Sequence, residues 1–227
     1  MKNYTELLGK YNVNNIFILG AGPSLYFNMQ EPFFKELSKY GLIIAVNSAI
    51  LATDPNFWIS NDSLCMRWSW WKNVKKSKCI KIVRNSWLKY KDDIRDFYIF
   101  KPRNTPEDVI DFEEKNLCYP CSVSSAIDLS IQLKCKNIFV LGLDHKLTED
   151  KHHFWQYFKN QPRQLKPAQA KWDVQKSVFP IHLKSYKALR GFAEYKNCKI
   201  YNCNSDSKVE IFEKIKFKDV EKIINGR

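Results

Sequence analysis

The chain has 227 residues, of which 44% are apolar and 15% aromatic, and 37 lysines and arginines against 24 aspartates and glutamates give a net charge of +13. A chain of this length and composition can bury a real core, which excludes global disorder and low-complexity or collagen-like architectures. Its apolar runs are shorter than the roughly 18–20 residues of a membrane span, and its first residues lack the layout of a secretory signal, so we expect a cytoplasmic protein.

Short, almost continuously apolar runs alternate along the chain with amphipathic stretches. The apolar runs predict strands at residues 15–20, 42–47, 57–60, 79–84, 97–100, 138–143 and 199–201. Helical spacing predicts helices at 31–40, 123–134 and 185–196, with Ser122 or Ser124 as the cap of the second. This alternation indicates an α/β fold, a Rossmann-like, mostly parallel twisted sheet with helices on both faces.

One irregular segment interrupts this alternation. Residues 145–180 hold three histidines, two tryptophans and three prolines without a clear period, which favours a lid or binding loop. We therefore expect residues 1–227 to form a single Rossmann-like nucleotide-binding transferase domain with a lid insertion at about 145–180.

Positive charge is concentrated in residues 66–103, which carry 12 lysines and arginines against three aspartates. Trp68, Trp70 and Trp71 lie near the start of this segment. Tryptophan beside lysine suits an anionic membrane surface, a polyanionic ligand or single-stranded nucleic acid. The alternative is a solvated basic face whose tryptophans anchor the core.

The seven cysteines are irregularly spaced, which indicates reduced thiols. Cys118 and Cys121 have CxxC spacing, but no second such pair completes a zinc site. We interpret the cysteines mainly as structural residues.

A glycine-containing loop, residues 20–24, follows the first predicted strand and consists of Gly20, Ala21, Gly22, Pro23 and Ser24. Glycine permits a tight turn and a close approach to a ligand, and a helix starting near Ser24 would direct free amides at a phosphate. The loop lacks the third glycine of the dinucleotide fingerprint and the GK[ST] of a Walker loop. It favours an anionic or nucleotide ligand, and a purely structural turn is the alternative.

Short polar side chains follow the next two predicted strands, at Asn47 and Ser48 and at Asn61 and Asp62. In parallel sheets ligands bind beyond the carboxyl ends of the strands, where such groups can hydrogen-bond a base, ribose or sugar. An ordinary Asx turn is the alternative at each position.

Two further polar groups flank the second predicted helix. Cys121, Ser122 and Ser124 open it, and their hydroxyls and amides could bind a nucleotide. Gly142 and Asp144 end the following strand, where Asp144 either accepts hydrogen bonds from a sugar hydroxyl or caps a loop.

Four histidines remain, at 145, 152, 153 and 182. For the first three a metal site is conceivable, but none has the i, i+4 spacing of a zincin, and a solvated lid is favoured. His182 precedes the last long predicted helix, and a neutral imidazole can remove a proton from an acceptor hydroxyl. A merely packed or surface histidine is the alternative.

Taken in order, these motifs resemble the bacterial sialyltransferases that use a CMP-activated sugar. They also resemble the related family that joins motility-associated glycosyltransferases with archaeal 6-hydroxymethylpterin diphosphokinases. The resemblance spans roughly residues 15–207, through the matching stretches 17–25, 45–47, 60–62, 121–144 and 182–205.

The resemblance implies an inverting, metal-independent glycosyltransferase with a nucleotide-sugar donor, preferably CMP-linked, and His182 as general base. The donor-binding roles that it carries over fall on Gly20, Gly22, Ser24, Asn47, Asn61 and Ser122. Two lid tyrosines stabilise the departing phosphate in the family, and Lys146 and His152 stand at matching distance from Asp144 here. A cation can neutralise that phosphate without a metal.

The implied partners are the donor and a glycan or lipid-linked acceptor. Residues 67–78, from Arg67 to Lys78, could hold the enzyme at an anionic inner-membrane surface. Nucleic acid is not favoured as a partner, and a homo-oligomer is left open.

Two other functions stay open. A diphosphokinase would need Mg²⁺ held by paired carboxylates, and the sequence offers Asp62 and Asp144 at strand ends but no tight acidic pair. A non-catalytic module could instead bind polyanions through the basic segment.

Overall fold

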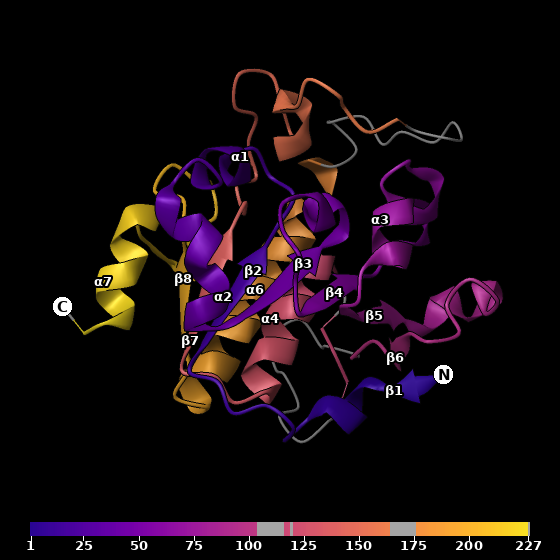
Figure 1. The fold of residues 1–227 in the computed structure, drawn as a ribbon. Coiled ribbons are helices and arrows are strands. Elements are labelled where there is room, and N and C mark those ends of the chain that lie inside the picture. Colours follow the sequence, from indigo (N-terminus) through magenta and orange to yellow (C-terminus); the bar gives the residue numbers. More distant parts are fainter. Residues whose placement is uncertain (104–115, 119, 164–175, 227) are drawn as a thin grey trace.

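The computed structural model describes residues 1–103, 116–118, 120–163 and 176–226. In these residues nine strands form one open sheet, in the order β1-β6-β5-β4-β3-β2-β7-β8-β9 (Figure 1). Every neighbouring pair of these strands is parallel. The strands are β1 (Lys2–Asn3), β2 (Asn15–Leu19), β3 (Leu42–Val46), β4 (Phe57–Ser60), β5 (Ile80–Arg84), β6 (Tyr98–Phe100), β7 (Asn137–Leu141), β8 (Lys199–Asn202) and β9 (Glu213–Lys214).

Helices lie on both faces of this sheet. The described α-helices are α1 (Ser24–Asn28), α2 (Leu37–Tyr40), α3 (Trp71–Lys76), α4 (Ser122–Gln132), α6 (Phe179–Tyr195) and α7 (Val220–Ile224). Short 3-10 helices fill several connections: η1 (Tyr4–Leu7), η2 (Pro32–Glu36), η3 (Asn47–Leu51), η4 (Ser63–Arg67), η5 (Asn85–Tyr90), η6 (Phe154–Tyr157) and η7 (Phe217–Asp219). Within the described ranges, no helix is both long enough and apolar enough to cross a lipid bilayer.

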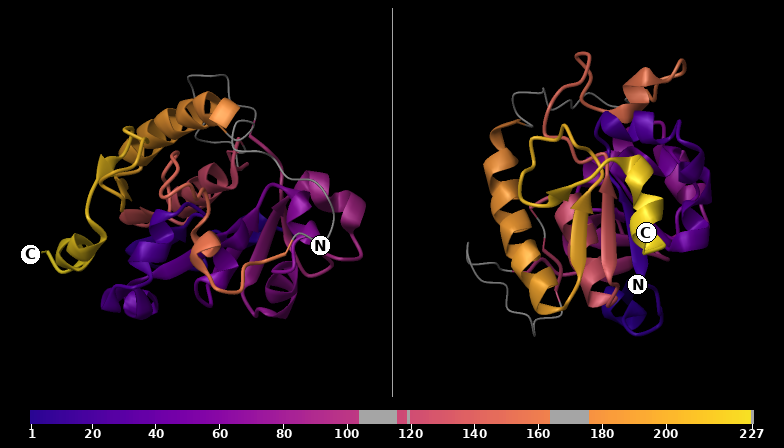
Figure 2. Two further views of the ribbon diagram at one scale, coloured as in Figure 1. Left: turned by 90° about the horizontal axis from the view of Figure 1, so that it is seen from above. Right: turned by 90° about the vertical axis from the view of Figure 1, so that its left-hand side faces the viewer.

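The two faces of the sheet carry separate hydrophobic clusters. Ile16 and Ile18 of β2 join the cluster that includes α4 and α6, whereas Phe17 and Leu19 join the cluster of α1, α2, α3 and α7. The result is a three-layer arrangement with the sheet in the middle (Figure 2). Because side chains of a strand alternate between faces and both faces are covered, a central strand must be apolar throughout. This double burial explains the continuous apolar runs in the sequence.

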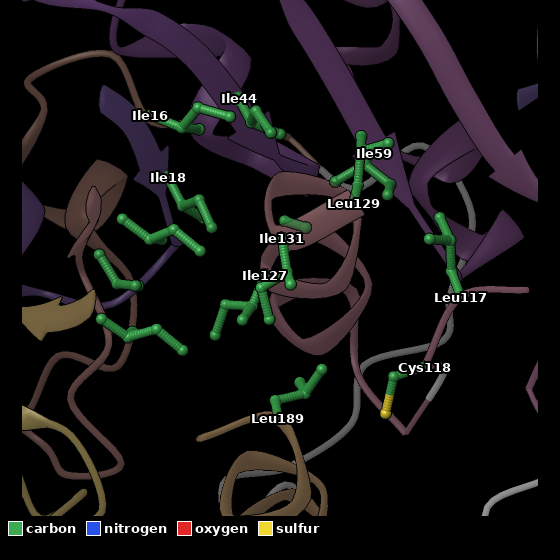
Figure 3. Packing of buried hydrophobic residues seen from close by; sticks show 14 of the residues in the cluster. Ile16, Ile18, Ile44, Ile59, Leu117, Cys118, Ile127, Leu129, Ile131 and Leu189 are labelled. Carbon is green, nitrogen blue, oxygen red and sulfur yellow. The ribbon is translucent and has the colours of Figure 1, made fainter. Parts of the chain in front are cut away.

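Helix α4 is fixed by its apolar side chains. Ile127 and Ile131 are one helical turn apart and pack with Leu129 against the isoleucines of β2, β3 and β4 (Figure 3). All three α4 side chains are buried. The packing holds the first turn of α4 at the carboxyl end of the sheet.

The α/β class, the parallel sheet and all of the predicted strands are confirmed, with bounds that differ by at most two residues. Residues 31–40 do not form a single α-helix, because 3-10 helix η2 precedes α2 there. The last long helix begins at Phe179, six residues before the predicted start, with Pro180 tolerated in the first turn, where no intrahelical N–H bond is needed. The cap of α4 is Cys121, rather than Ser122 or Ser124.

The chain reverses its direction of travel across the sheet between β2 and β7. From β2 it proceeds through β3, β4 and β5 toward one edge, whereas β7 leads through β8 to the other. The connections that follow β2 and β7 therefore lead toward opposite edges of the sheet, and a crevice beyond the carboxyl ends of the strands at such a reversal is the usual ligand position.

Candidate active site

A pocket of about 170 Å³ lies in this crevice, beyond the carboxyl ends of β2, β3 and β7. It brings together 11 of the predicted site residues: Ala21, Gly22, Pro23, Asn47, Cys121, Ser122, Gly142, Asp144, Lys146, His152 and His182. Sequence reasoning did not assign Val46, Val123, Leu143, His145, His153, Phe179 and Tyr186, which also line it.

Gly20 and Gly22 allow the loop after β2 to lie directly against the loop after β7. Gly20 N–H donates to the carbonyl of Leu141 at 2.7 Å, and Gly22 N–H donates to the carbonyl of Gly142 at 3.0 Å. A Cβ at Gly22 would lie 2.5 Å from Asp144 Oδ2 and 2.7 Å from that carbonyl. Ala21, Gly22 and Pro23 line the pocket, but the amide of Gly22 is already used by the protein.

Asp144 holds the start of α1. Its carboxylate accepts hydrogen bonds from the Ser24 amide at 2.8 Å, the Ser24 hydroxyl at 2.5 Å and the Asn204 side-chain amide at 2.6 Å. Burial raises the pKa of Asp144, and the Ser24 and Asn204 hydrogen bonds oppose that shift. The expectation that the Ser24 amide is free for a phosphate is therefore wrong in this structure, because an internal carboxylate occupies that position.

Asn47 and Ser122 meet in the pocket wall. Asn47 adopts a positive φ of 52°, and its Oδ1 accepts a hydrogen bond from Ser122 Oγ at 3.4 Å. Ser122 Oγ also accepts from the Asn61 N–H at 2.9 Å, which links the ends of β3 and β4 to α4. Among the described residues, Asn47 Nδ2 has no hydrogen-bond partner, so it is available to a ligand.

The first turn of α4 forms one side of the pocket. Cys121 Sγ accepts from Ser124 N–H at 3.4 Å and lies 3.2 Å from the buried hydroxyl of Tyr186. An α-helix carries partial positive charge at its N-terminus, where unpaired amides favour an anion. Cys121, Ser122 and Val123 therefore present a phosphate-compatible surface to the pocket.

All four histidines of the chain line this one pocket. Burial lowers the pKa of each ring, to about 4 for His145 and His153, so all four are neutral at pH 7. The favoured prediction of a solvated histidine lid is wrong, because the His145 ring stacks on Phe179 at 4.0 Å and His153 Nδ1 lies 3.3 Å from the Ala21 carbonyl oxygen. Within the described part of the chain, no cluster of three His, Cys, Asp or Glu residues could hold a metal ion.

His182 stands in the first turn of α6. Burial lowers its pKa, while a hydrogen bond to the Pro120 backbone opposes the shift. Its ring centroid lies 5.7 Å from that of His145. A neutral, pocket-lining imidazole of this kind has the protonation state that a general base requires.

Six predicted residues do not line the pocket: Gly20, Ser24, Ser48, Asn61, Asp62 and Ser124. The Asn61 side chain exchanges hydrogen bonds with Ser125, and Ser124 Oγ lies 2.7 Å from Ser185 Oγ with Ser124 fully buried. Ser48 is buried in η3, and Asp62 caps η4 through the Leu64 amide. Ser24, Asn61 and Ser124 instead hydrogen-bond three residues that do line it, Asp144, Ser122 and Cys121.

The described part of the predicted lid is anchored on the protein. Phe154 is fully buried, and its N–H donates to the Ala21 carbonyl at 3.1 Å. Tyr157 stacks on Tyr26 of α1 with ring centroids 4.5 Å apart. Figure 1 shows this segment beside α1, above the carboxyl ends of the strands. Residues 164–175 of the predicted lid lie outside the described ranges.

Trp70 and Trp71 belong to the core. They are 4% and 7% exposed in the cluster that contains α3, and Trp68 packs on Trp155 at 5.4 Å. The core-anchoring alternative therefore describes Trp70 and Trp71. A membrane surface remains a prediction that rests on exposed lysines such as Lys72 and Lys75.

Two solved structures share this architecture at low sequence identity. The MAf glycosyltransferase from Magnetospirillum magneticum AMB-1 matches 96% of this chain with a TM-score of 0.60 and 13% identity, and the chain spans 37% of that protein. The sialyltransferase CstII from Campylobacter jejuni, solved with the substrate analogue CMP-3FNeuAc, matches 89% of this chain and 86% of its own, with a TM-score of 0.50 and 15% identity.

Comparisons of the sequence alone find no match. No protein-family model matches the chain, and no curated protein matches it. At these identities the structural likeness is one of fold. The chain thus has a Rossmann-like fold that is also found in glycosyltransferases.

Proposed function

We propose that this chain is an inverting glycosyltransferase that moves a sugar from a nucleotide-sugar donor to a hydroxyl acceptor without a metal ion. The observation that carries the proposal is the pocket beyond the carboxyl ends of β2 and β7, where the strand order reverses. It combines the start of α4, the free amide donor of Asn47, one lysine and four neutral histidines. The fold is shared with a MAf glycosyltransferase and with a sialyltransferase.

The donor would place its phosphate between α4 and Lys146. The partial positive charge of the helix start and the lysine ammonium both favour an anion there. Lys146 and His152 line the same pocket, so the lysine ammonium can neutralise the charge that develops as the nucleotide phosphate departs, and the neutral His152 ring can donate a hydrogen bond to it. A CMP-linked sugar is the preferred donor, because CstII was solved with a CMP-sugar analogue.

His182 would act as the base. Its neutral ring accepts the proton of the acceptor hydroxyl, the oxygen attacks the anomeric carbon, and the bond from that carbon to the phosphate oxygen breaks. The lowered pKa of His182 keeps the ring unprotonated through neutral pH. Attack from the face opposite the leaving phosphate inverts the anomeric carbon.

The pocket volume limits how a donor can bind. At about 170 Å³ it is smaller than the roughly 300–1,000 Å³ of most small-molecule sites. A whole nucleotide sugar would therefore extend beyond this pocket or displace part of its wall. The stacked pair His145 and Phe179 forms one section of that wall.

Ligand-dependent thermal stability tests the proposal. CMP, UDP, GDP and ATP are each added with Mg²⁺ or with EDTA, since a ligand that binds only the folded form stabilises it. At 100 times Kd the gain is about 2.7 kcal/mol, or roughly 5–11 °C in Tm for a chain of this length. A shift with CMP in EDTA, followed by transfer from a CMP-sugar, supports the proposal. A shift confined to ATP with Mg²⁺ supports the diphosphokinase instead.

A matched pair of variants locates the phosphate. Lys146→Ala removes a cation that lines the pocket, whereas Lys151→Ala removes a nearby lysine that lies over the Tyr157 ring at 4.4 Å. Lys146→Ala should weaken CMP and leave cytidine unchanged, because cytidine has no phosphate. Equal loss with both variants would contradict the proposed phosphate position.

A further inference from the structure

A second pocket lies on the same edge of the sheet. Its volume of about 350 Å³ is about twice that of the first and falls in the range of small-molecule sites. Leu51 from η3 after β3, and Ser69 and Trp70 from the connection after β4, contribute to its wall. Since β4, β3 and β2 are neighbours in a parallel sheet, both pockets lie beyond adjoining carboxyl ends.

One wall of this pocket is formed by Phe158 and residues 160–163. They continue the segment whose His152 and His153 line the first pocket. Arg163 N–H donates to Ser69 Oγ at 2.9 Å, and Ser69 N–H donates to the Arg163 carbonyl at 2.8 Å. Between the two pockets, His153 stacks on Trp155 at 5.3 Å, and Trp155 packs on Trp68 at 5.4 Å. A packed row of rings thus runs from His153, which lines the first pocket, to Trp68, which precedes the pocket-lining Ser69 and Trp70 of the second.

The charged side chains among the lining residues of the second pocket are both positive. Lys72 and Arg163 line it, and no carboxylate of the described residues does. Neither side chain forms an ion pair with any residue in the described ranges. Two unpaired cations facing one cavity favour an anionic ligand, and guanidinium matches the geometry of carboxylate or phosphate.

The remaining lining suits a hydroxylated ligand. Asn73 and Asn160 provide amides that both donate and accept hydrogen bonds, as sugar hydroxyls require. Trp70 and Phe158 provide an apolar section of wall. Cations, amides and aromatic rings together match a saccharide that bears an acidic group better than a bare ion.

We propose that the second pocket binds the acceptor, a saccharide with a carboxylate or phosphate group held by Lys72 and Arg163. Its role as acceptor site rests on the proposed transferase function. The acidic group of the saccharide would lie beyond the ring row of His153, Trp155 and Trp68, and the saccharide would extend past this row so that its reacting hydroxyl meets His182 in the first pocket.

Binding of matched monosaccharides, measured by ligand-observed NMR, tests this inference. The probes are glucuronate and glucose 6-phosphate, with glucose as the neutral counterpart and inorganic phosphate as the bare anion. The double variant Lys72→Ala/Arg163→Ala should lose about 10-fold or more in affinity for both acidic sugars. Lys75→Ala is the control, because Lys75 is an exposed residue of the same helix that does not line the pocket.

Four outcomes decide the matter. Acidic sugars that bind together with CMP, and lose affinity only in the double variant, support the proposal. Equal binding of glucose, or of phosphate alone, would overturn the acidic-saccharide assignment. Displacement of the sugar by CMP would overturn the separate pocket. Sugar binding without any nucleotide binding would keep the saccharide site and overturn its acceptor role together with the transferase function.

Discussion

Residue 22 offers the most direct test of the pocket geometry, since the loops after β2 and β7 leave no room there for a side chain. In Gly22→Ala the new Cβ would stand 2.5 Å from Asp144 Oδ2 and 2.7 Å from the Gly142 carbonyl oxygen. Real Cβ atoms essentially never approach a neighbour closer than 3.0 Å, so the two loops must separate by several tenths of an ångström.

Neither neighbour can move freely. Asp144 is held by the Ser24 amide, the Ser24 hydroxyl and Asn204, and the Gly142 carbonyl accepts the Gly22 N–H. Over-packing of this kind costs about 1–3 kcal/mol. At about 2–4 °C per kcal/mol for a chain of this length, Tm should fall by roughly 2–12 °C in a calorimetric scan. CMP affinity should fall as well, because Gly22 lines the pocket.

Gly191→Ala is the matched control. Gly191 lies in α6, and a Cβ there would meet no atom within 4 Å. Alanine in a helix is more stable than glycine by roughly 0.5–1 kcal/mol, so this variant should melt slightly above the parent protein. A Gly22→Ala protein that melts at or above the parent temperature would refute the close approach of the two loops.

Three other predictions concern buried charge and histidine. His182→Ala should abolish transfer and retain CMP binding by calorimetry, and the kcat/KM of the parent should stay flat from pH 8 to below 6.5 because burial lowers the pKa of His182. His145 and His153 have pKa values near 4 against the ordinary 6.5, so below pH 6.5 the unfolded chain binds more protons than the folded one. The free energy of unfolding, measured by urea titration, should therefore decline from pH 6.5 to 4. If His145→Gln left the slope of this free energy against pH unchanged, the reasoning would be contradicted. Asp128→Ala should cost about 3–5 kcal/mol in the same assay, because it removes the buried carboxylate that pairs with the fully buried Arg103, and Arg103→Met/Asp128→Leu should recover part of this loss.

The sheet was predictable from the sequence because a strand buried on both faces is apolar at every position. Residues Ile16 to Leu19 show this, since all are fully buried. The approximate place of the pocket followed from the polar residues at strand ends, so Asn47 and Ser122 were found although 75 residues separate them. Both inferences depend on local patterns and on the parallel topology.

Contacts between distant segments were not predictable in the same way. That Asp144 takes the Ser24 amide depends on a contact across 120 residues, and no local pattern distinguishes it from a free helix start. The burial of His153 depends on how its segment folds back onto Ala21. Trp70 beside Lys72 has the same sequence pattern whether its ring faces a membrane or the core, so only packing decides between them.

The gathering of every imidazole around one cavity has a practical consequence for spectroscopy. Selective isotope labelling of histidine would give signals from four rings only, each of them at the pocket wall. Chemical-shift changes on adding a nucleotide or a sugar would then report occupancy of the cavity without background from elsewhere in the chain. The same four signals, followed through a pH titration, would assign an ionisation midpoint to each ring.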